Sequence, residues 1–351
     1  RPEYAAMPVI AVPDTVRALG DVARDYRSLF TGPVAAITGS SGKTTAKEMI
    51  RTVVSSDRNV HATAGNFNNQ IGVPLTVFGL GAGHDCAVFE LGMSAPNEIA
   101  YLAGITRPDI GVILNVGPAH MAFFDSVDEI AEAKMELLGA LDENGLAIVN
   151  ADDPLLGDAS RRCGCRIAGF GVNSECEYRA GDIRFDDDGC PAFSLNGVDF
   201  TLPVPGTHSV YNACAAVAVG EALGIDARSA AGSLADFTAP AMRMRIEEHD
   251  GVTVINDAYN ANPVSMRSAA CVLASRRVRN GSRRIAVLGD MLELGARSAM
   301  EHRELGGLFA GIADVLVTVG VFALDCADGA VAAGMNGENI RTFEGSREAG
   351  A

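Results

Sequence analysis

The stretch Val34-Ala-Ala-Ile-Thr-Gly-Ser-Ser-Gly-Lys-Thr-Thr45 decides the fold of this chain. It opens with a short apolar run that is typical of a buried strand, and it turns through Gly39 and Gly42 into a predicted helix, Thr45–Val54. Glycines let the N–H groups of a loop approach an anion closely, and the start of a helix adds the positive end of its dipole. The stretch therefore predicts a loop that binds phosphate groups.

The polar residues of this loop are expected to contact the phosphates of a nucleotide and a bound Mg²⁺ ion. The Lys43 amine can reach the outer phosphates of a nucleotide, and the Thr44 hydroxyl can ligate Mg²⁺. The strict pattern, GxxxxGK(S/T), has a longer gap between its glycines than the two residues found here, which indicates a subtype. The alternative is a Gly-Ser turn that only caps a helix. The predicted nucleotide contacts of the loop are Gly39, Ser40, Ser41, Gly42, Lys43, Thr44 and Thr45.

Further apolar runs, bounded by Gly, Pro or Asp, predict more strands. The strand candidates are Cys86–Leu91, Ile110–Val116 and Leu146–Asn150, and the helix candidates beside them are Thr15–Leu29 and Val127–Leu141. Strands that alternate with helices favour an α/β fold, with a mainly parallel sheet covered on both faces. Residues 165–205 break this rhythm, and we expect them to form a β-rich excursion at the edge of the sheet.

A second alternating series follows Pro240 and predicts a separate Rossmann-like domain. Its strand and helix candidates are Val252–Asn256, Pro263–Ser275, Arg284–Gly289, Ser298–Ala310 and Val315–Val319. We therefore divide the chain into a lead-in at 1–33, a central phosphate-loop domain at 34–240 and a C-terminal domain at 241–351. The chain does not begin with Met, and the second series stops early, so we expect both terminal parts to be incomplete.

Composition limits the classes of partner. A net charge of −16 argues against a nonspecific nucleic-acid binder, which needs a basic face, but not against local phosphate contacts. No run of eighteen apolar residues is present, so no membrane span is expected. The eight cysteines lack a disulfide spacing, and Cys163-Gly-Cys165 has no second pair or nearby His to complete a zinc site. We expect free thiols in a cytosolic, monomeric protein.

Three residues outside the loop are candidates for metal chemistry. Glu90 ends a predicted strand, where it is either a Mg²⁺ ligand beside the loop or a solvated strand end. His120 follows another strand and either completes the same metal shell or is structural. Lys134 lies in a helical stretch with Glu132 and Glu136 two positions to either side. On the sequence alone it is a solvated surface lysine.

Several motifs occur together in a known order and spacing. The sequence resembles the Mur ligases, which build the peptide stem of bacterial peptidoglycan, and the resemblance covers nearly all of residues 34–345. Two late segments favour the member that joins D-Ala-D-Ala to UDP-N-acetylmuramoyl-tripeptide through an acyl phosphate. The motifs are Thr38-Gly-Ser-Ser-Gly-Lys-Thr44, Gly65-Asn-Phe-Asn-Asn-Gln-Ile-Gly-Val-Pro74, Glu90-Leu-Gly92, Asn115-Val-Gly-Pro-Ala-His120, Ala133-Lys134, Asn256-Asp-Ala-Tyr-Asn-Ala-Asn-Pro263 and Leu288-Gly-Asp-Met-Leu-Glu-Leu-Gly295.

The resemblance implies ATP and two Mg²⁺ ions as cofactors. Lys43 and Thr44 would hold the ATP phosphates and the first ion, and Glu90 and His120 would hold the second. Lys134 matches a lysine that is carbamylated in this family, which converts a cation into a carboxylate-like metal ligand. Such a reaction needs a neutral amine, and burial or neighbouring charges supply it by lowering the pKa of the lysine.

The resemblance also implies the remaining contacts of the site. Asn212, which follows Pro205-Gly-Thr-His208, would contact the adenine side, Arg243 the γ-phosphate and Asp257 the ribose. Asn66 and Asn69 would line the nucleotide and substrate cleft, with Tyr259, Asn260 and Asn262 nearby.

Two departures from the family pattern concern the ends of the chain. Family members carry a full N-terminal domain that binds the uridine diphosphate, whereas only its last helix is recognisable here. They also carry a Lys-Gly-Ser-Arg-like segment, which Phe343-Glu-Gly-Ser-Arg347 does not replace because its context predicts a helix start.

Two other functions stay open at this point. One is a related ligase with a different acceptor, such as a folylpolyglutamate synthase. The other is a phosphate-loop nucleotide-binding module without ligase activity.

Overall fold

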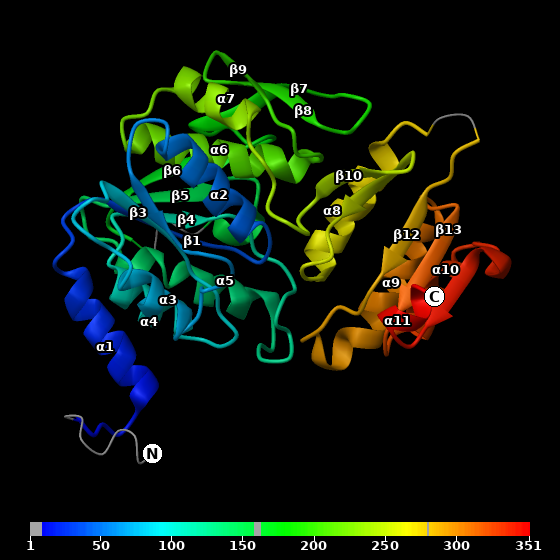
Figure 1. The fold of residues 1–351 in the computed structure, drawn as a ribbon, viewed down its shortest axis with the longest axis horizontal. Coiled ribbons are helices and arrows are strands. Elements are labelled where there is room, and N and C mark those ends of the chain that lie inside the picture. The colour runs from blue at the N-terminus through cyan, green and yellow to red at the C-terminus, as the bar shows by residue number, and fades with distance from the viewer. Residues whose placement is uncertain (1–8, 158–162, 279–280) are drawn as a thin grey trace.

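The computed structural model describes residues 9–157, 163–278 and 281–351. Its strands form a nine-stranded sheet, a two-stranded ribbon and a three-stranded sheet. Figure 1 shows the large sheet and its helices on the left and the two smaller sheets, coloured yellow to red, on the right. None of the helices in the described ranges combines the length and apolarity needed to cross a bilayer. All eight cysteines are free, as expected.

The large sheet is built around β1, with the strand order β2-β3-β1-β4-β5-β6-β7-β8-β9. Pairing is parallel from β2 to β7 and antiparallel between β7, β8 and β9. The predicted α/β fold is therefore confirmed, and the irregular part between 165 and 205 does end the sheet. The strands are β1 Val34–Thr38, β2 Val60–Ala62, β3 Cys86–Glu90, β4 Ile110–Ile113, β5 Leu146–Asn150, β6 Arg166–Gly171, β7 Tyr178–Phe185, β8 Pro191–Leu195 and β9 Val198–Thr201.

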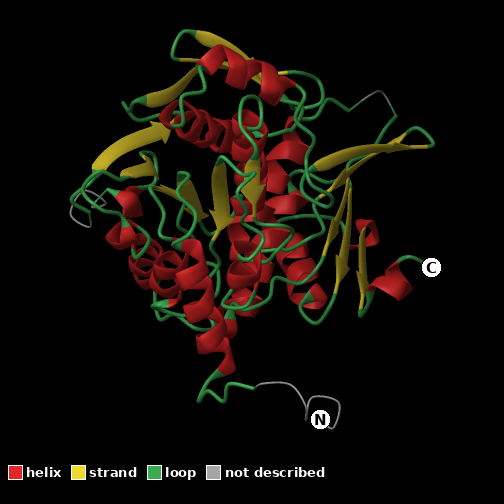
Figure 2. Ribbon diagram, turned by 60° about the vertical axis from the view of Figure 1, so that its left-hand side comes forward, coloured by secondary structure: helices red, strands yellow, loops and turns green. Residues whose placement is uncertain are grey.

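Helices cover both faces of this sheet, and each face has its own core. Because successive strand residues point to opposite faces, Ala35 and Ile37 pack against α2, α6 and α7, whereas Val34 and Ala36 pack against α1, α3, α4 and α5. Figure 2 shows the strands lying between these two sets of helices. The helices are α1 Thr15–Arg27, α2 Lys43–Val54, α3 Gly72–Val77, α4 Glu98–Thr106, α5 Val127–Met135, α6 Thr207–Ala222 and α7 Ala227–Ala235, with short 3₁₀ turns at Leu138–Ala140 and Pro154–Leu156.

Five of these elements differ from their predicted bounds. Helix α1 ends at Arg27 rather than Leu29, and strand β3 ends at Glu90 rather than Leu91. The helix after the phosphate loop begins at Lys43 rather than Thr45, directly after Gly42 turns the chain with φ of 79°. Strand β4 ends at Ile113 rather than Val116, because the chain beyond it bends toward the loop, where the Asn115 carbonyl accepts a hydrogen bond from the Ser40 N–H. Helix α5 stops at Met135, and a 3₁₀ turn continues the stretch that was predicted as one helix.

The second part of the chain corrects one expectation. We expected Val252–Asn256 to be a strand of the C-terminal parallel sheet, but it pairs antiparallel with Arg245–His249 in a separate ribbon. The physical reason is the two-residue turn Asp250-Gly251, whose φ angles of 49° and 79° match the turn that closes hairpins of this length. The C-terminal sheet proper contains three parallel strands, in the order β12-β13-β14.

The remaining elements complete this part. They are β10 Arg245–His249, β11 Val252–Asn256, α8 Pro263–Ser275, β12 Ile285–Leu288, α9 Ser298–Ala310, β13 Val315–Val319, α10 Ala323–Ala332, β14 Ile340–Phe343 and α11 Ser346–Ala349, with 3₁₀ turns at Gly295–Arg297 and Gly337–Asn339. The helix start predicted near Arg347 is thus present, and the division of the chain at residue 240 stays a prediction.

Helices α9 and α10 approach each other through glycine. A Cβ atom added to Gly306 would lie 1.8 Å from the carbonyl oxygen of Cys326, and one added to Gly329 would lie 1.9 Å from the carbonyl oxygen of Arg303. Both neighbours are backbone atoms, which cannot move aside as a side chain does. The close packing of this helix pair therefore requires glycine at both positions.

We expect Gly306→Ala to destabilise the C-terminal part by roughly 1–3 kcal/mol, because the added methyl group forces the two helices apart. Gly307→Ala is the matched control on the same helix, since its Cβ would meet nothing closer than 3.6 Å. Alanine favours helix more than glycine does, so the control should be neutral or stabilising. Urea unfolding measures both, and equal free energies of unfolding for the two variants would contradict the packing argument.

Candidate active site

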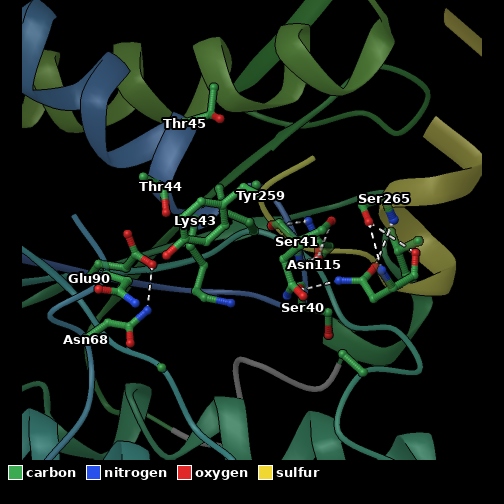
Figure 3. Close-up of a pocket in the computed structure, with 18 of the residues that line it drawn as sticks. Ser40, Ser41, Lys43, Thr44, Thr45, Asn68, Glu90, Asn115, Tyr259 and Ser265 are labelled. Atoms are coloured by element: carbon green, nitrogen blue, oxygen red, sulfur yellow. Dashed lines mark hydrogen bonds between the residues drawn. The ribbon is translucent and has the colours of Figure 1, made fainter. Parts of the chain in front are cut away.

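A cavity of about 840 Å³ lies where the large sheet meets the C-terminal part. The phosphate loop, the ends of β3 and β4 and the start of α6 line it from one side, and the segment from Arg243 to Ser268 lines it from the other. Figure 3 shows Lys43, Glu90 and Tyr259 facing this space. The cavity lies at the carboxyl edge of the parallel strands, where ligands of open α/β sheets bind.

The phosphate loop is held in shape by its own polar groups and by the loop after β4. The Ser41 N–H donates to Oδ1 of Asn115 at 2.9 Å, and Nδ2 of Asn115 donates back to the Ser41 carbonyl at 3.2 Å. Nζ of Lys43 donates to the Gly39 carbonyl at 2.7 Å, so its amine lies along the loop. These contacts leave the loop curved around the cavity, as phosphate binding requires.

Lys43 carries the positive charge nearest to the loop. Burial lowers the pKa of its amine, the Glu90 carboxylate opposes that change, and the Arg243 guanidinium reinforces it. These three charges therefore act on one another across the cavity. An anion placed between Lys43 and Arg243 would relieve their repulsion, so the cavity favours a ligand that carries several negative charges.

Glu90 has one oxygen engaged and one free. Oε1 accepts a hydrogen bond from Nδ2 of Asn68 at 2.8 Å, whereas Oε2 is buried and has no hydrogen-bond partner among the described residues. The side chain is 2% exposed, which excludes the alternative of a solvated strand end. A buried carboxylate oxygen without a partner is unfavourable unless a cation or donor occupies the neighbouring space.

Lys134 is only 2% exposed, so the prediction of a solvated surface lysine is wrong. Residues two positions apart on a helix point in different directions, so exposed Glu132 lies away from it. Glu136 is occupied elsewhere, where it accepts from the N–H groups of Asn97 and Ala100 at the start of α4. Burial, with a further contribution from the Lys43 charge, lowers the pKa of Lys134 well below its usual value.

His120 lies at the mouth of the cavity and contacts the C-terminal part. Its Nδ1 is 2.5 Å from Oε2 of Glu293. Burial lowers the pKa of the imidazole, the Glu293 carboxylate opposes that shift, and the charges of Lys43 and Lys134 add to the lowering. These electrostatic contributions show that His120 and both lysines belong to one cluster of interacting charges.

These residues fit a magnesium site that is completed by a nucleotide. Among the described residues no cluster of three or more His, Cys, Asp or Glu could hold a metal. Mg²⁺ rarely needs such a cluster, since it is usually bound by one or two carboxylates together with substrate phosphates and waters. Glu90, with its unpaired oxygen, and Thr44, with its hydroxyl, both line the cavity and are suitable ligands.

Arg243 and Asp257 enter the cavity from the other side. The Arg243 guanidinium stacks on the Tyr259 ring, 3.9 Å from its centroid, which fixes the charge in place. Oδ1 of Asp257 accepts from the Met244 N–H at 3.0 Å. Burial raises the pKa of Asp257 to about 6, although this hydrogen bond and the Arg243 charge both oppose the shift.

The asparagines of the site fall into two groups. Asn69 and Asn262 are structurally engaged, because each accepts hydrogen bonds from N–H groups at the first turn of a helix, α3 and α8 respectively. Asn262 also reaches the phosphate loop, where its Nδ2 is 3.4 Å from the Ser40 carbonyl. Asn212 is different, because its Nδ2 is buried without a partner in the described structure and remains available to a ligand.

The cavity gathers nearly all of the predicted site residues. Two of them do not line it: Gly39, the first residue of the phosphate loop, and Lys134. The predicted residues that line it are Ser40, Ser41, Gly42, Lys43, Thr44, Thr45, Asn66, Asn69, Glu90, His120, Asn212, Arg243, Asp257, Tyr259, Asn260 and Asn262.

Sequence reasoning missed four residues that the structure brings to the site. Asn68 and Asn115 hold Glu90 and the phosphate loop, respectively, and both lie inside the sequence motifs quoted above. His208 lines the cavity, and burial lowers its pKa to about 4, so its ring is neutral. Glu293 lies 173 positions from its partner His120, and no local pattern signals such a contact.

The fold and the cavity define a class: an α/β nucleotide-binding enzyme with a phosphate loop and a site completed by a second, C-terminal part. Two family models match the chain, the "Mur ligase middle domain" over residues 37–220 and the "Mur ligase, glutamate ligase domain" over residues 242–351. The chain belongs to the Mur ligase family.

Individual relatives agree with this membership. The UDP-N-acetylmuramoyl-tripeptide–D-alanyl-D-alanine ligase of Bacillus subtilis is 38% identical over 327 residues, which cover 92% of this chain and 70% of that one. MurF from Acinetobacter baumannii superimposes with a TM-score of 0.88 at 34% identity, covering 97% of this chain and 75% of that one. MurF from Thermotoga maritima, solved in complex with ADP, has a TM-score of 0.83 at 28% identity, covering 98% and 83%.

The raised pKa of Asp257 predicts a dependence of stability on pH. The folded protein holds this proton more tightly than the unfolded chain, so the free energy of unfolding should fall as the pH rises from about 4 to about 6. Asp257→Asn keeps the acceptor for the Met244 N–H but removes the charge. Urea unfolding should therefore show the variant more stable than the parent at pH 7 and equal to it at pH 4. A constant difference across this range would contradict the assignment.

Proposed function

We propose that this protein is an ATP-dependent ligase that joins D-Ala-D-Ala to UDP-N-acetylmuramoyl-tripeptide in peptidoglycan precursor synthesis. The observation that carries the proposal is the convergence of Lys43, the free oxygen of Glu90 and Arg243 on one cavity from two separate parts of the fold. The names of the relatives indicate the substrates, and the Thermotoga maritima complex supports a nucleotide in this site. Use of ATP and a UDP-linked precursor favours a cytoplasmic location.

The reaction runs in two steps. The terminal carboxylate of the tripeptide attacks the γ-phosphorus of ATP in line, which forms an acyl phosphate and releases ADP. The amine of D-Ala-D-Ala then attacks the acyl carbon, and the tetrahedral intermediate collapses to an amide and inorganic phosphate. In the first step both reactants are anions, so the main task of the protein is to supply positive charge and alignment.

Named residues perform this task. Lys43 and Arg243 would flank the transferred phosphoryl group, because their charges interact across the cavity, and the stacking of Arg243 on the Tyr259 ring holds its guanidinium in place. The Thr44 hydroxyl would hold the first Mg²⁺ ion, Glu90 and His120 would hold the second, and carbamylated Lys134 would be a further metal ligand. When bound, Mg²⁺ neutralises phosphate charge and fixes its geometry. Contact between the two parts excludes water, which protects the acyl phosphate from hydrolysis.

We further propose that Lys134 is carbamylated. Its neutral amine nitrogen attacks the carbon of CO₂ and releases one proton, and the new N–C bond leaves an anionic carbamate. Burial and the neighbouring Lys43 charge favour the neutral amine that this step requires. The product replaces a buried neutral amine by an anion close to the Lys43 charge. The chain contains only three lysines, Lys43, Lys47 and Lys134, so few other side chains could undergo the same reaction.

The first prediction of this proposal concerns phosphate release. With ATP, Mg²⁺ and the UDP-muramoyl tripeptide, release should require D-Ala-D-Ala. It should disappear in Lys43→Ala and fall about a hundredfold or more in Arg243→Ala, since each variant removes a charge that stabilises the transition state. Arg245→Ala is the matched control, because Arg245 is exposed and pairs with Glu247.

The pattern of release separates the alternatives. Release that responds to glutamate or another amino acid, and not to D-Ala-D-Ala, would identify a related ligase with a different acceptor. Slow phosphate release that does not depend on any acceptor would indicate a nucleotide-binding module without ligase activity.

The carbamate makes a separate prediction. In ¹³C-bicarbonate the protein should show a carbamate carbon resonance by NMR. The resonance should be absent in Lys134→Arg, whose guanidinium does not form a carbamate. Lys43→Arg should retain it, because that control removes another lysine amine while keeping its positive charge near Lys134. A spectrum without the resonance in the parent protein, or with it in Lys134→Arg, would show that Lys134 is unmodified.

A further inference from the structure

The contact between His120 and Glu293 joins the two parts of the molecule beside the cavity. Nδ1 of His120 and Oε2 of Glu293 are 2.5 Å apart, and the two side chains are 25% and 46% exposed. His120 belongs to the loop after β4, whereas Glu293 belongs to the loop after β12. Both residues line the cavity. The pair is thus a direct bond from the C-terminal part to a residue assigned to the metal site.

The backbone around this pair is arranged for the contact. Both residues have a φ angle of 61°, which is a left-handed backbone conformation that is unfavourable for residues other than glycine. Two residues after His120, the Ala122 N–H donates to the Glu293 carbonyl at 2.9 Å. This hydrogen bond attaches the two loops to each other. The neighbouring Gly295 has φ of 57°, and a Cβ there would lie 3.3 Å from Cα of Ala122. The two strained loops therefore fit closely against each other.

The bond determines which nitrogen of His120 is free. A carboxylate that contacts Nδ1 favours the proton on that nitrogen, which leaves the lone pair of Nε2 for a cation. Histidines that ligate metals commonly donate their other N–H to such a carboxylate, which fixes the tautomer and the orientation of the ring. Here the carboxylate comes from a different part of the fold than the histidine.

We propose that Glu293 is a positioning residue that holds His120 ready for the second Mg²⁺ ion, and that it does so only while the C-terminal part lies against the phosphate-loop part. The inference rests on the proposed function, since it takes His120 as a metal ligand. It makes Mg²⁺ binding dependent on the contact between the two parts. The second ion is then held firmly only when Arg243 is also at the cavity.

A purely structural ion pair would behave differently. An exposed pair of this kind contributes about 0–1 kcal/mol to stability and does not change the affinity for a metal ion. The proposal therefore needs measurements on the ring and on the ion. Three variants serve: Glu293→Ala removes the acceptor, Glu293→Gln keeps a neutral acceptor, and Glu338→Ala removes an exposed carboxylate from the same part of the chain.

The first measurement is ¹⁵N NMR of histidine-labelled protein, in which His120→Ala identifies the His120 signals. We expect His120 in the parent to carry its proton on Nδ1. In Glu293→Ala the ring should populate the Nε2–H tautomer, whereas Glu293→Gln and Glu338→Ala should keep the parent pattern. An unchanged His120 tautomer in Glu293→Ala would overturn the inference.

The second measurement is the affinity for Mn²⁺ in the presence of a non-hydrolysable ATP analogue, followed by electron paramagnetic resonance. Loss of an outer partner of a metal-ligating histidine commonly weakens binding by roughly 10–100-fold, so Glu293→Ala should weaken the second Mn²⁺ by about that factor. Glu293→Gln should recover most of the affinity, and Glu338→Ala should match the parent.

His120→Ala distinguishes the two ways of failing. If His120→Ala binds the second Mn²⁺ as tightly as the parent does, then the proposed metal role of His120 is wrong and the inference is lost with it. If His120→Ala weakens the second ion but Glu293→Ala does not, the metal role stands and the positioning role of Glu293 is wrong.

Discussion

The parallel pairing of β1 between β3 and β4 is the constraint on which the rest of the site depends. In this register Ile37 pairs with Glu90 and Thr38 pairs with Ile113, so three strands reach the same edge of the sheet together. The phosphate loop, the metal-ligand candidate Glu90 and the loop that carries Asn115 therefore begin within a few ångströms of one another. A slip of one residue would reverse the faces of β1 and exchange its two cores.

The site brings buried cations and carboxylates together in a chain that is acidic overall. The protein carries a net charge of −16, and its cavity brings Lys43 and Arg243 together with carboxylates that include Glu90 and Asp257, while Lys134 lies close enough to interact with the Lys43 charge. Burial makes each of these charges unfavourable without a partner, which is why the pKa of both lysines is lowered. A polyphosphate with Mg²⁺ supplies the missing partners. The substrate thus completes an electrostatic arrangement that the protein leaves unbalanced.

Local sequence predicted the features that depend on short segments. The phosphate loop, the strands β5 and β13 and the helices α8 and α9 follow from apolar runs, glycines and a proline start, so their residues could be identified directly. Lys134 shows the limit of such reasoning, because neighbouring glutamates suggested exposure while the helix turned it inward. The ribbon β10–β11 was missed for a related reason: a strand pattern does not reveal which strand is its partner.

The family resemblance placed Arg243 and Asp257 at the nucleotide site, but the direct contact between His120 and Glu293 could not be predicted from the sequence. Each lies inside a recognised motif, but nothing in either motif indicates the other residue as its partner, and only the packing of two distant loops brings them together. The same packing brings Arg243 and Asp257 to the cavity. The residues that complete the site therefore all belong to the same part of the chain. A reactive acyl phosphate is safest when its activating charge is present only while water is excluded. Placing that charge on the C-terminal part achieves this, since separation of the two parts withdraws Arg243 from the cavity as it admits water.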